Sequence, residues 1–533
     1  MKRSFNLTQL SAAMAVAMGA LGTATPTLAV NLSDNGLGAV GLVPYYTVRN
    51  NIDTNISVVN TSAEYVVAFK IRFREGDNSR DARDFNVFLS PNDVWTATVT
   101  RLPDGDDDPS NDVPVLVTND QSCTAPILQP VDELGGRPGI LFTNIAYDGS
   151  SAPIFPADGG SGTIERAQEG HIEVIEMGVA DPEISELASW AVHGPTQDCA
   201  GISDVYLETR TVPNSRRCDE RERPPVVTGN AAFEAEYCEP LNVLKVSANL
   251  IRVDKGVAGG MPVEMLANFF NPNDGIELPL LPDPRDLMQT PESTDPNLND
   301  TDPPISAQIT EAGPLIVAFT DSDRAGADAV SSLFMSTNVI NEYAIGGAGL
   351  AQNAWVVNFP TKNFYVDTQL SDDFRPFEEF FQPNGVSCVT VDYLYWNREE
   401  AFEIPPPGGL EPSPPPIVTI PEDSICQETQ TLNFGDSTLL GSKNNYDVPL
   451  VDGFTSGWMR LLFRNAGSIN GLTLDLDLDP LETVASFKGL PVQGFSIKSL
   501  ENGVAAENIL NYGIISEHAY LRDIDVEVVE GEL

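Results

Sequence analysis

A cluster of carboxylates in the segment PDGDDDPSND is the clearest group of side chains that could hold an ion. Asp104, Asp106, Asp108 and Asp112 lie there, with Asp107 between them. Closely spaced hard oxygen ligands are what Ca²⁺ requires, although the segment lacks the Gly and Glu positions of an EF-hand loop. Solvated acidic loops also arise in acidic chains without any metal. Two interpretations therefore stay open, a Ca²⁺ site and a plain surface loop.

The three histidines do not form a catalytic pattern. His171, His193 and His518 are far apart in the sequence, and neither G-x-S-x-G nor H-E-x-x-H occurs. We expect a structural or surface role for each. Paired carboxylates for glycoside hydrolysis cannot be recognised against a background of 77 acidic residues. The sequence therefore predicts no catalytic and no cofactor-binding residue.

Two groups of aromatic residues could stack on sugar rings. Core packing is the simpler explanation for the first group. Adjacent phenylalanines that follow two acidic residues are harder to bury together, so the second group is the better candidate for a contact surface. The groups are Tyr393, Tyr395 and Trp396 in DYLYW, and Phe374, Phe377, Phe380 and Phe381 in DFRPFEEFF.

The charge of the chain limits its partners. The 533 residues include 30 basic and 77 acidic side chains, for a net charge of −47. Such a surface repels phosphate backbones and anionic lipids, which excludes nucleic acid as a partner. A hydrophobic share of 41% is nevertheless enough to build a core.

The N-terminal segment has the features of a secretory signal peptide. Lys2 and Arg3 precede an apolar stretch at 10–24, and small residues before position 30 predict cleavage after Ala29. No later stretch approaches the length of apolar sequence that spans a bilayer, so we expect no integral membrane segment in the mature chain. The predicted location is the periplasm, the cell surface or the extracellular medium.

Six cysteines agree with an oxidising compartment. An even number in an exported chain predicts disulfides, although the sequence leaves their connectivity open. None of the cysteines lies in a C-x-x-C pair, which disfavours zinc and redox chemistry. Local pairing predicts three bonds, Cys388–Cys426, Cys218–Cys238 and Cys123–Cys199.

The elements that position these residues are strands. Runs of β-branched and aromatic residues, bounded by turn residues, lie at 40–48, 54–62, 64–75, 84–91 and 93–102. Short turns between them predict antiparallel neighbours. We therefore expect an all-β fold of antiparallel, immunoglobulin-like β-sandwich domains, with long Pro/Asp-rich loops and a few short helices. In the run at 64–75, alternate residues form an apolar face, and the residues between them form a face that we expect to lie in water. The apolar face consists of Val67, Phe69, Ile71 and Phe73, and the other face consists of Val66, Ala68, Lys70, Arg72 and Arg74.

Two segments rich in Pro and Asp organise the mature chain. Residues 281–305 predict an acidic loop or linker between an N-terminal β-sandwich region at 30–280 and a C-terminal β-rich region at 306–533. The Pro-rich segment 403–423 would ordinarily be a linker. If Cys388 pairs with Cys426, however, it is a closed loop within one domain.

Several sequence blocks are spread over most of the chain: PYYTV, TNISVVNTS, VAFKIRFREGDNSRDARDFNVFLSPNDVWTA, EGHIEVIEMG, WVVNFPTKNFYVD and GLPVQGFSIKSLENG. These blocks are similar to a group of uncharacterised exported proteins of Gram-negative, mostly gammaproteobacterial, origin. The N-terminal blocks also resemble immunoglobulin-like modules of surface proteins. No activity is assigned to the group, so the resemblance implies an exported β-rich protein and no catalytic residue.

The sequence predicts a non-enzymatic role. We expect an envelope or cell-surface structural or adhesion protein, assisted by Ca²⁺ if the acidic cluster binds it. Its partners would be further copies of the chain or other envelope and matrix components. The first alternative is an extracellular or periplasmic module that binds a glycan or another small ligand. The second is a secreted carboxylate-dependent hydrolase, which is the least favoured.

Overall fold

Strands, nearly all paired antiparallel, are the dominant elements of the described residues, as the sequence predicts, and four short α-helices accompany them. The helices are α2 (Glu186–Ala191), α3 (Cys199–Tyr206), α6 (Ala325–Ser332) and α7 (Asn363–Val366). The computed structural model describes residues 29–103, 105, 108–152, 156–207, 209–212, 236–238, 240–270, 296–311, 313–320, 323–346, 351–403, 423–474, 483–505 and 508–528. Most of the predicted signal peptide and of the segments 281–305 and 403–423 lies outside these residues.

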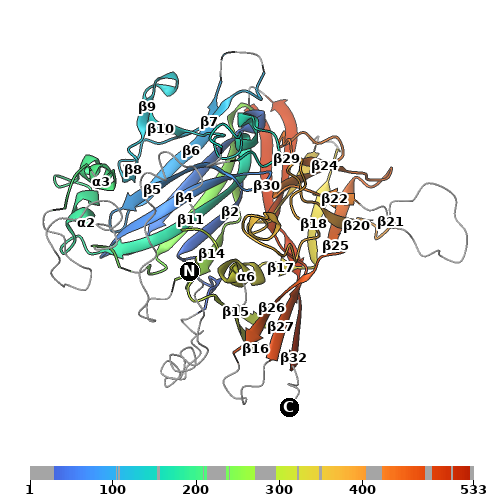
Figure 1. Cartoon of the computed structure of the whole chain (residues 1–533). Coiled ribbons are helices and arrows are strands. Elements are labelled where there is room, and N and C mark those ends of the chain that lie inside the picture. The colour runs from blue at the N-terminus through green and yellow to red at the C-terminus, as the bar shows by residue number, and fades with distance from the viewer. Residues whose placement is uncertain are drawn as a thin grey trace, which may run out of the picture.

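Two seven-stranded sheets form a sandwich in the N-terminal half (Figure 1). Sheet 1 has the order β1 (Asn31–Leu32), β14 (Glu264–Ala267), β2 (Val40–Thr47), β11 (Glu169–Ala180), β4 (Val66–Glu75), β5 (Asp81–Leu89), β8 (Cys123–Ala125). Sheet 2 has the order β13 (Val257–Met261), β12 (Leu244–Arg252), β3 (Asp53–Asn60), β6 (Val94–Leu102), β7 (Val113–Val117), β10 (Arg137–Leu141), β9 (Gln129–Val131). Phe69 and Phe85 of sheet 1 meet Trp95 of sheet 2 edge-on, at 6.1 and 6.0 Å between ring centres.

A second sandwich occupies the C-terminal half. Sheet 3 has the order β21 (Phe402–Glu403), β20 (Val389–Asn397), β25 (Ser456–Phe463), β18 (Asn338–Ala344), β31 (Ala519–Leu521), and β22 (Asp423–Ile425) also pairs with β20. Sheet 4 has the order β24 (Asn445–Val448), β23 (Thr429–Phe434), β19 (Ala351–Asn358), β29 (Gln493–Ala505), β30 (Asn508–Glu517). Tyr343 of sheet 3 stacks on Phe434 of sheet 4 at 5.4 Å, inside the shared core.

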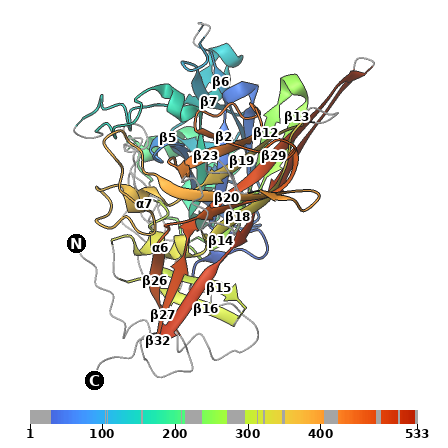
Figure 2. The same cartoon turned by 90° about the vertical axis from the view of Figure 1, so that its right-hand side faces the viewer.

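A fifth sheet projects away from the two sandwiches (Figure 2). It has the order β15 (Ile305–Thr310), β16 (Gly313–Ala318), β26 (Ser468–Thr473), β27 (Thr483–Lys488), β32 (Asp523–Val528). The short strands β17 (Met335–Ser336) and β28 (Leu490–Pro491) pair with each other. Four 3₁₀ turns complete the described elements: Arg49–Asn51, Asp132–Leu134, Ile164–Gln168 and Val253–Lys255.

Strand β19 of sheet 4 is buried on both faces, and this joins the halves into one body. Successive residues of β19 face opposite sides. Trp355 and Val357 belong to the core shared with sheet 3, whereas Ala354 and Val356 belong to the core of the N-terminal sandwich. Described strands before residue 268 belong to sheets 1 and 2, and those after residue 304 belong to the other sheets.

The polar face of β4 does not lie in water, so that prediction is wrong. Lys70, Arg72 and Arg74 are 0, 1 and 7% exposed. Each cation meets a carboxylate from β5: Lys70 Nζ lies 2.6 Å from Asp84 Oδ2, and Asp81 lies 2.6 Å from Arg72 and 3.0 Å from Arg74. Alternation along a strand shows which residues share a face, but not what covers that face.

The turn between β4 and β5 reaches into the C-terminal half. The Thr429 N–H donates to the Gly76 carbonyl at 2.9 Å, and the Asn444 side-chain amide donates to Asp77 at 2.8 Å. At its end, Arg80 forms an ion pair with Asp367 at 3.0 Å. Polar groups of one hairpin therefore fix the position of the two sandwiches relative to each other.

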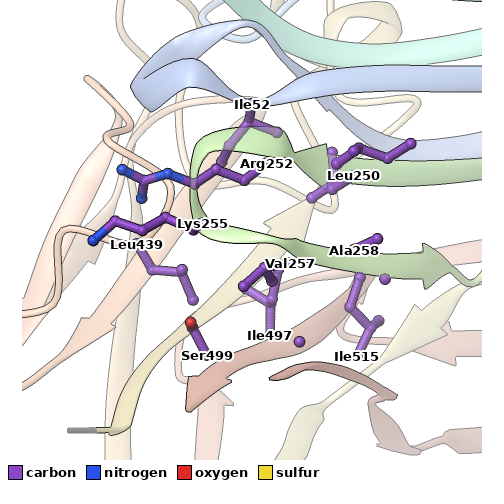
Figure 3. A pocket seen from close by; sticks show the side chains of 13 residues that line it. Ile52, Leu250, Arg252, Lys255, Val257, Ala258, Leu439, Ile497, Ser499 and Ile515 are labelled. Atoms are coloured by element: carbon purple, nitrogen blue, oxygen red, sulfur yellow. The ribbon is translucent and has the colours of Figure 1, made fainter. Parts of the chain in front are cut away.

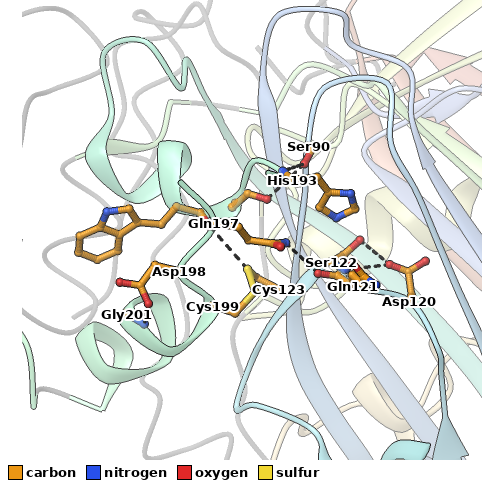
Figure 4. The surroundings of a disulfide bond; sticks show 12 residues. Ser90, Asp120, Gln121, Ser122, Cys123, His193, Gln197, Asp198, Cys199 and Gly201 are labelled. Atoms are coloured by element: carbon orange, nitrogen blue, oxygen red, sulfur yellow. Dashed lines mark hydrogen bonds between the residues drawn. A yellow bond between two sulfur atoms is a disulfide. The ribbon is translucent and has the colours of Figure 1, made fainter. Parts of the chain in front are cut away.

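Two of the predicted disulfides are present, Cys123–Cys199 and Cys388–Cys426. The first joins β8, at the edge of sheet 1, to α3 (Figure 4). Asp198 caps α3 by accepting the Gly201 N–H at 2.8 Å, so the bonded cysteine is the first residue of a well-capped helix. The third predicted pair involves Cys218, which lies outside the described residues.

Candidate functional site

A pocket of about 550 Å³ opens at one end of sheet 3. Pockets that bind small ligands usually have volumes of roughly 300–1,000 Å³. Three strands of sheet 3 and the turn after β20 supply most of its wall, and β29 of sheet 4 contributes one cation. The lining residues are Glu342, Tyr343, Ala344, Trp396, Asn397, Arg398, Glu400, Gly457, Trp458 and Lys498.

Two tryptophans form the apolar wall of this pocket. Trp396 at the end of β20 and Trp458 at the start of β25 are directly paired residues of neighbouring strands. Their rings stack with 4.0 Å between centres and 7° between planes. Both side chains are half-buried, in contrast to the fully packed Tyr395 and Met459 beside them. Strand alternation explains the difference, because neighbours along a strand point to opposite faces of the sheet.

The backbone beside the tryptophan pair is tightly packed. Gly457 approaches the Trp396 carbonyl so closely that an added Cβ would lie 1.7 Å from the carbonyl oxygen. Tyr343 donates its hydroxyl to the same carbonyl oxygen at 3.2 Å. The Asn397 side chain accepts the Glu399 and Ala401 N–H groups, each at 2.9 Å, and fixes the turn that follows. The pocket wall is therefore preorganised.

Charged groups of both signs surround the aromatic wall. Lys498 and Glu342 form an ion pair, in which the Glu342 side chain is 61% exposed. Arg398 and Glu400 are exposed on the turn between β20 and β21. Two cations and two carboxylates balance one another, although the chain as a whole carries a net charge of −47. The pocket thus offers donors, acceptors and aromatic surface without a strong preference for ligand charge.

This arrangement suits binding better than acid–base catalysis. A glycosidase needs one carboxyl group that stays protonated near neutral pH, which usually requires an apolar environment. Glu342 is exposed and paired with Lys498, so it does not lie in such an environment. The aromatic wall, by contrast, is what stacking on a sugar ring requires.

A second crevice, drawn in Figure 3, is a packing gap. It lies between the β12–β13 hairpin and the strands β29 and β30, where Leu250 and Val257 face Ile497 and Ile515. About 20 Å³ is available there. That volume admits roughly one water molecule, and the apolar lining gives such a water few partners.

The described part of the predicted Ca²⁺ cluster is held by protein groups. Asp108 accepts the Ser110 N–H at 3.0 Å, and Asp112 forms an ion pair with Arg101 at 3.1 Å. Asp104 and Asp106 lie outside the described residues. Within the described ranges, no three His, Cys, Asp or Glu side chains converge on a metal-sized site. The Ca²⁺ site stays a prediction.

The predicted aromatic groups have different positions. Tyr393 and Tyr395 are 4 and 0% exposed and belong to the core, as expected. Trp396, the third member, stacks on Trp458 and lines the pocket. In the second group, Phe377 is buried, and Phe380 contacts Phe374 at 5.2 Å between ring centres. The sequence did not indicate Trp458 as a candidate, because its pairing with Trp396 joins strands that are about 60 residues apart in the chain.

The histidines occupy three separate environments. His171 is buried on sheet 1, 3.8 Å from Glu173. His193 is partly exposed and lies 3.5 Å from Asp93. His518 is buried between the Asn341 side chain and the Val356 carbonyl, at 2.9 and 3.0 Å, and burial lowers its pKa to about 4. None of them lines the tryptophan pocket.

Comparison with protein families, curated proteins and solved structures gave no match. Along the described part of the chain, no helix is both long and apolar enough to cross a membrane. The tryptophan pocket is therefore the feature of the molecule that bears on its function.

Proposed function

We propose that this chain is an exported, non-enzymatic protein that binds a saccharide in the pocket formed by Trp396 and Trp458. One observation carries the proposal: a stacked, half-buried tryptophan pair in a pocket edged by charged side chains. The C–H groups on one face of a sugar ring pack against an aromatic face, and its hydroxyls need donors and acceptors around the rim. Asn397, Arg398 and Glu400 supply both kinds of group.

The proposal favours the glycan-binding alternative over a purely structural role. A purely structural role does not require two partly exposed tryptophans beside a pocket, since burying them further would stabilise the fold. A role at the cell surface remains part of the proposal, because a saccharide-binding module attaches its carrier to glycan-coated surfaces. Export by a signal peptide, an immunoglobulin-like N-terminal module and Ca²⁺ binding belong to the same proposal.

A glycan array probed with the full mature chain tests this function. We expect hits among neutral saccharides, and calorimetry with the best one gives its affinity. Trp458→Ala should lower that affinity about three- to tenfold, the value of one stacking contact. Tyr512→Ala is the matched control, because Tyr512 is an aromatic residue on β30, 56% exposed and outside the pocket. An array without hits would contradict the proposal, and so would an equal loss of saccharide affinity in Trp458→Ala and Tyr512→Ala.

A further inference from the structure

Lys70 and Asp84 lie in contact within the buried face of sheet 1. They come from the neighbouring strands β4 and β5, where Arg72 pairs with Asp84 and Lys70 with Asn86, so the two residues are diagonal neighbours. Lys70 Nζ lies 2.6 Å from Asp84 Oδ2, and the side chains are 0 and 1% exposed. Such a contact between a primary amine and a carboxyl group brings together the two halves of an amide bond.

The contact differs from an ordinary ion pair in its direction. Nζ is this close to Asp84 Oδ2, but neither oxygen of Asp84 accepts a hydrogen bond of regular geometry. The amine therefore approaches the carboxyl group outside the directions in which a carboxylate accepts hydrogen bonds. By comparison, the Arg72 guanidinium donates to Asp81 with regular geometry at 2.6 Å.

The surroundings favour the uncharged forms of both groups. Burial, reinforced by Arg72, lowers the pKa of Lys70, against the opposing charges of Asp84 and Asp81. Burial, reinforced by Asp81, raises the pKa of Asp84, against Lys70 and Arg72. An unprotonated amine and a protonated carboxyl group are the forms that react with each other. Proximity in a rigid sheet supplies the orientation that the reaction needs.

Removing the charges also benefits the fold. A buried ion pair must be paid for in desolvation of both partners, which its mutual attraction does not always recover. An amide in the same place is neutral and still offers one donor and one acceptor. Water released by the condensation leaves for bulk solvent.

We propose that Lys70 and Asp84 form an intramolecular isopeptide bond. The lone pair of Lys70 Nζ attacks Asp84 Cγ, so that an N–C bond forms and the C–OH bond of the protonated carboxyl group breaks. The hydroxyl leaves with one amine proton as water, and the other proton stays on the new amide nitrogen. The step needs no oxidant, cofactor or second protein. The bond ties β4 to β5 at the base of the hairpin whose turn joins the two halves of the molecule.

Intact-mass measurement of the reduced, denatured mature chain tests the bond. We expect a mass about 18 Da below that of the sequence, the mass of one water. Trypsin should then release one branched peptide, residues 50–72 joined to residues 84–101, because an acylated Lys70 is not cleaved. A full mass together with a linear peptide ending at Lys70 would overturn the proposal and leave a plain ion pair.

Three variants test whether the bond forms between Lys70 and Asp84. Lys70→Arg keeps the positive charge but cannot form the amide, so its mass should be full. Asp84→Asn should instead lose about 17 Da relative to its own sequence, because ammonia replaces water as the leaving group. Lys498→Arg is the matched control, because it alters an ion-paired lysine elsewhere in the chain. It should keep the deficit of about 18 Da that we expect for the unmodified chain. A deficit that persists in Lys70→Arg would also exclude this bond.

Discussion

Asp77 accepts a hydrogen bond from the Asn444 side chain at 2.8 Å, and this contact joins the N-terminal sandwich to the C-terminal one. The two residues are 9 and 6% exposed. Arg166 lies 3.3 Å from the other carboxylate oxygen of Asp77. Burial, reinforced by the neighbouring Glu75, nevertheless raises the pKa of Asp77 to about 6. The junction between the halves therefore contains a carboxyl group that titrates in a mildly acidic range.

The pH dependence of stability should report on this group. Because the pKa of Asp77 is higher in the folded than in the unfolded chain, its stabilising contribution is fully present below the unfolded value and is lost as pH rises through about 6. The free energy of unfolding should therefore decline between pH 4 and pH 7, and we expect Asp77→Asn to remove the part of this decline that Asp77 causes. Denaturant unfolding at each pH measures it. Asp523→Asn on the exposed edge strand is the control, and identical pH profiles for Asp77→Asn and the unmodified chain would contradict the prediction.

Gly457 should be intolerant of any side chain. A Cβ would lie 1.7 Å from the Trp396 carbonyl oxygen, so β25 and β20 must separate beside the tryptophan pair. We expect Gly457→Ala to lower the free energy of unfolding by about 1–3 kcal/mol and to weaken the near-ultraviolet circular dichroism of the stacked rings. Gly260→Ala is the control, since its Cβ would meet only the Asn249 side chain at 3.3 Å. Unchanged dichroism in Gly457→Ala would show that the strands do not pack this closely.

Substitution of Glu342 distinguishes saccharide binding from saccharide hydrolysis. Its side chain is exposed and paired with Lys498, so it can contribute hydrogen bonds to a ligand, and it lacks the apolar surroundings of a glycosidase acid. We expect Glu342→Gln to change saccharide affinity by less than about tenfold, and no reducing ends to appear when the unmodified chain is incubated with its ligand. Release of reducing sugar that Glu342→Gln abolishes would instead identify a hydrolase.

The Cys388–Cys426 disulfide should contribute substantially to stability. It closes a loop with a sequence separation of 38 residues. Loop-closure entropy of that length corresponds to about 4 kcal/mol in the chain-entropy description. Replacement of both cysteines by serine should lower the free energy of unfolding accordingly, as measured by denaturant titration. A loss below about 1 kcal/mol would mean that the unfolded chain is already constrained in this region.

Local patterns predicted the parts of the fold that depend on neighbouring residues. Alternation in β4 correctly placed Phe69 and Ile71 on the core face, because side chains alternate in any strand. The same alternation placed Lys70 and Arg72 in water, which was wrong. What covers a face depends on segments remote in sequence, and here the charges are neutralised by carboxylates of the adjacent strand.

The sequence by itself determined an all-β protein with a strongly acidic composition, and two of its three predicted disulfides, Cys123–Cys199 and Cys388–Cys426, are confirmed. Strand formation, turn chemistry and net charge are properties of short segments or of composition, so they can be read without a model of the fold. Only the tertiary structure decided the pairing of Trp396 with Trp458 and the contact of Lys70 with Asp84. Both depend on strand register and on the order of strands in a sheet, which arise from the simultaneous burial of many side chains and not from any one segment.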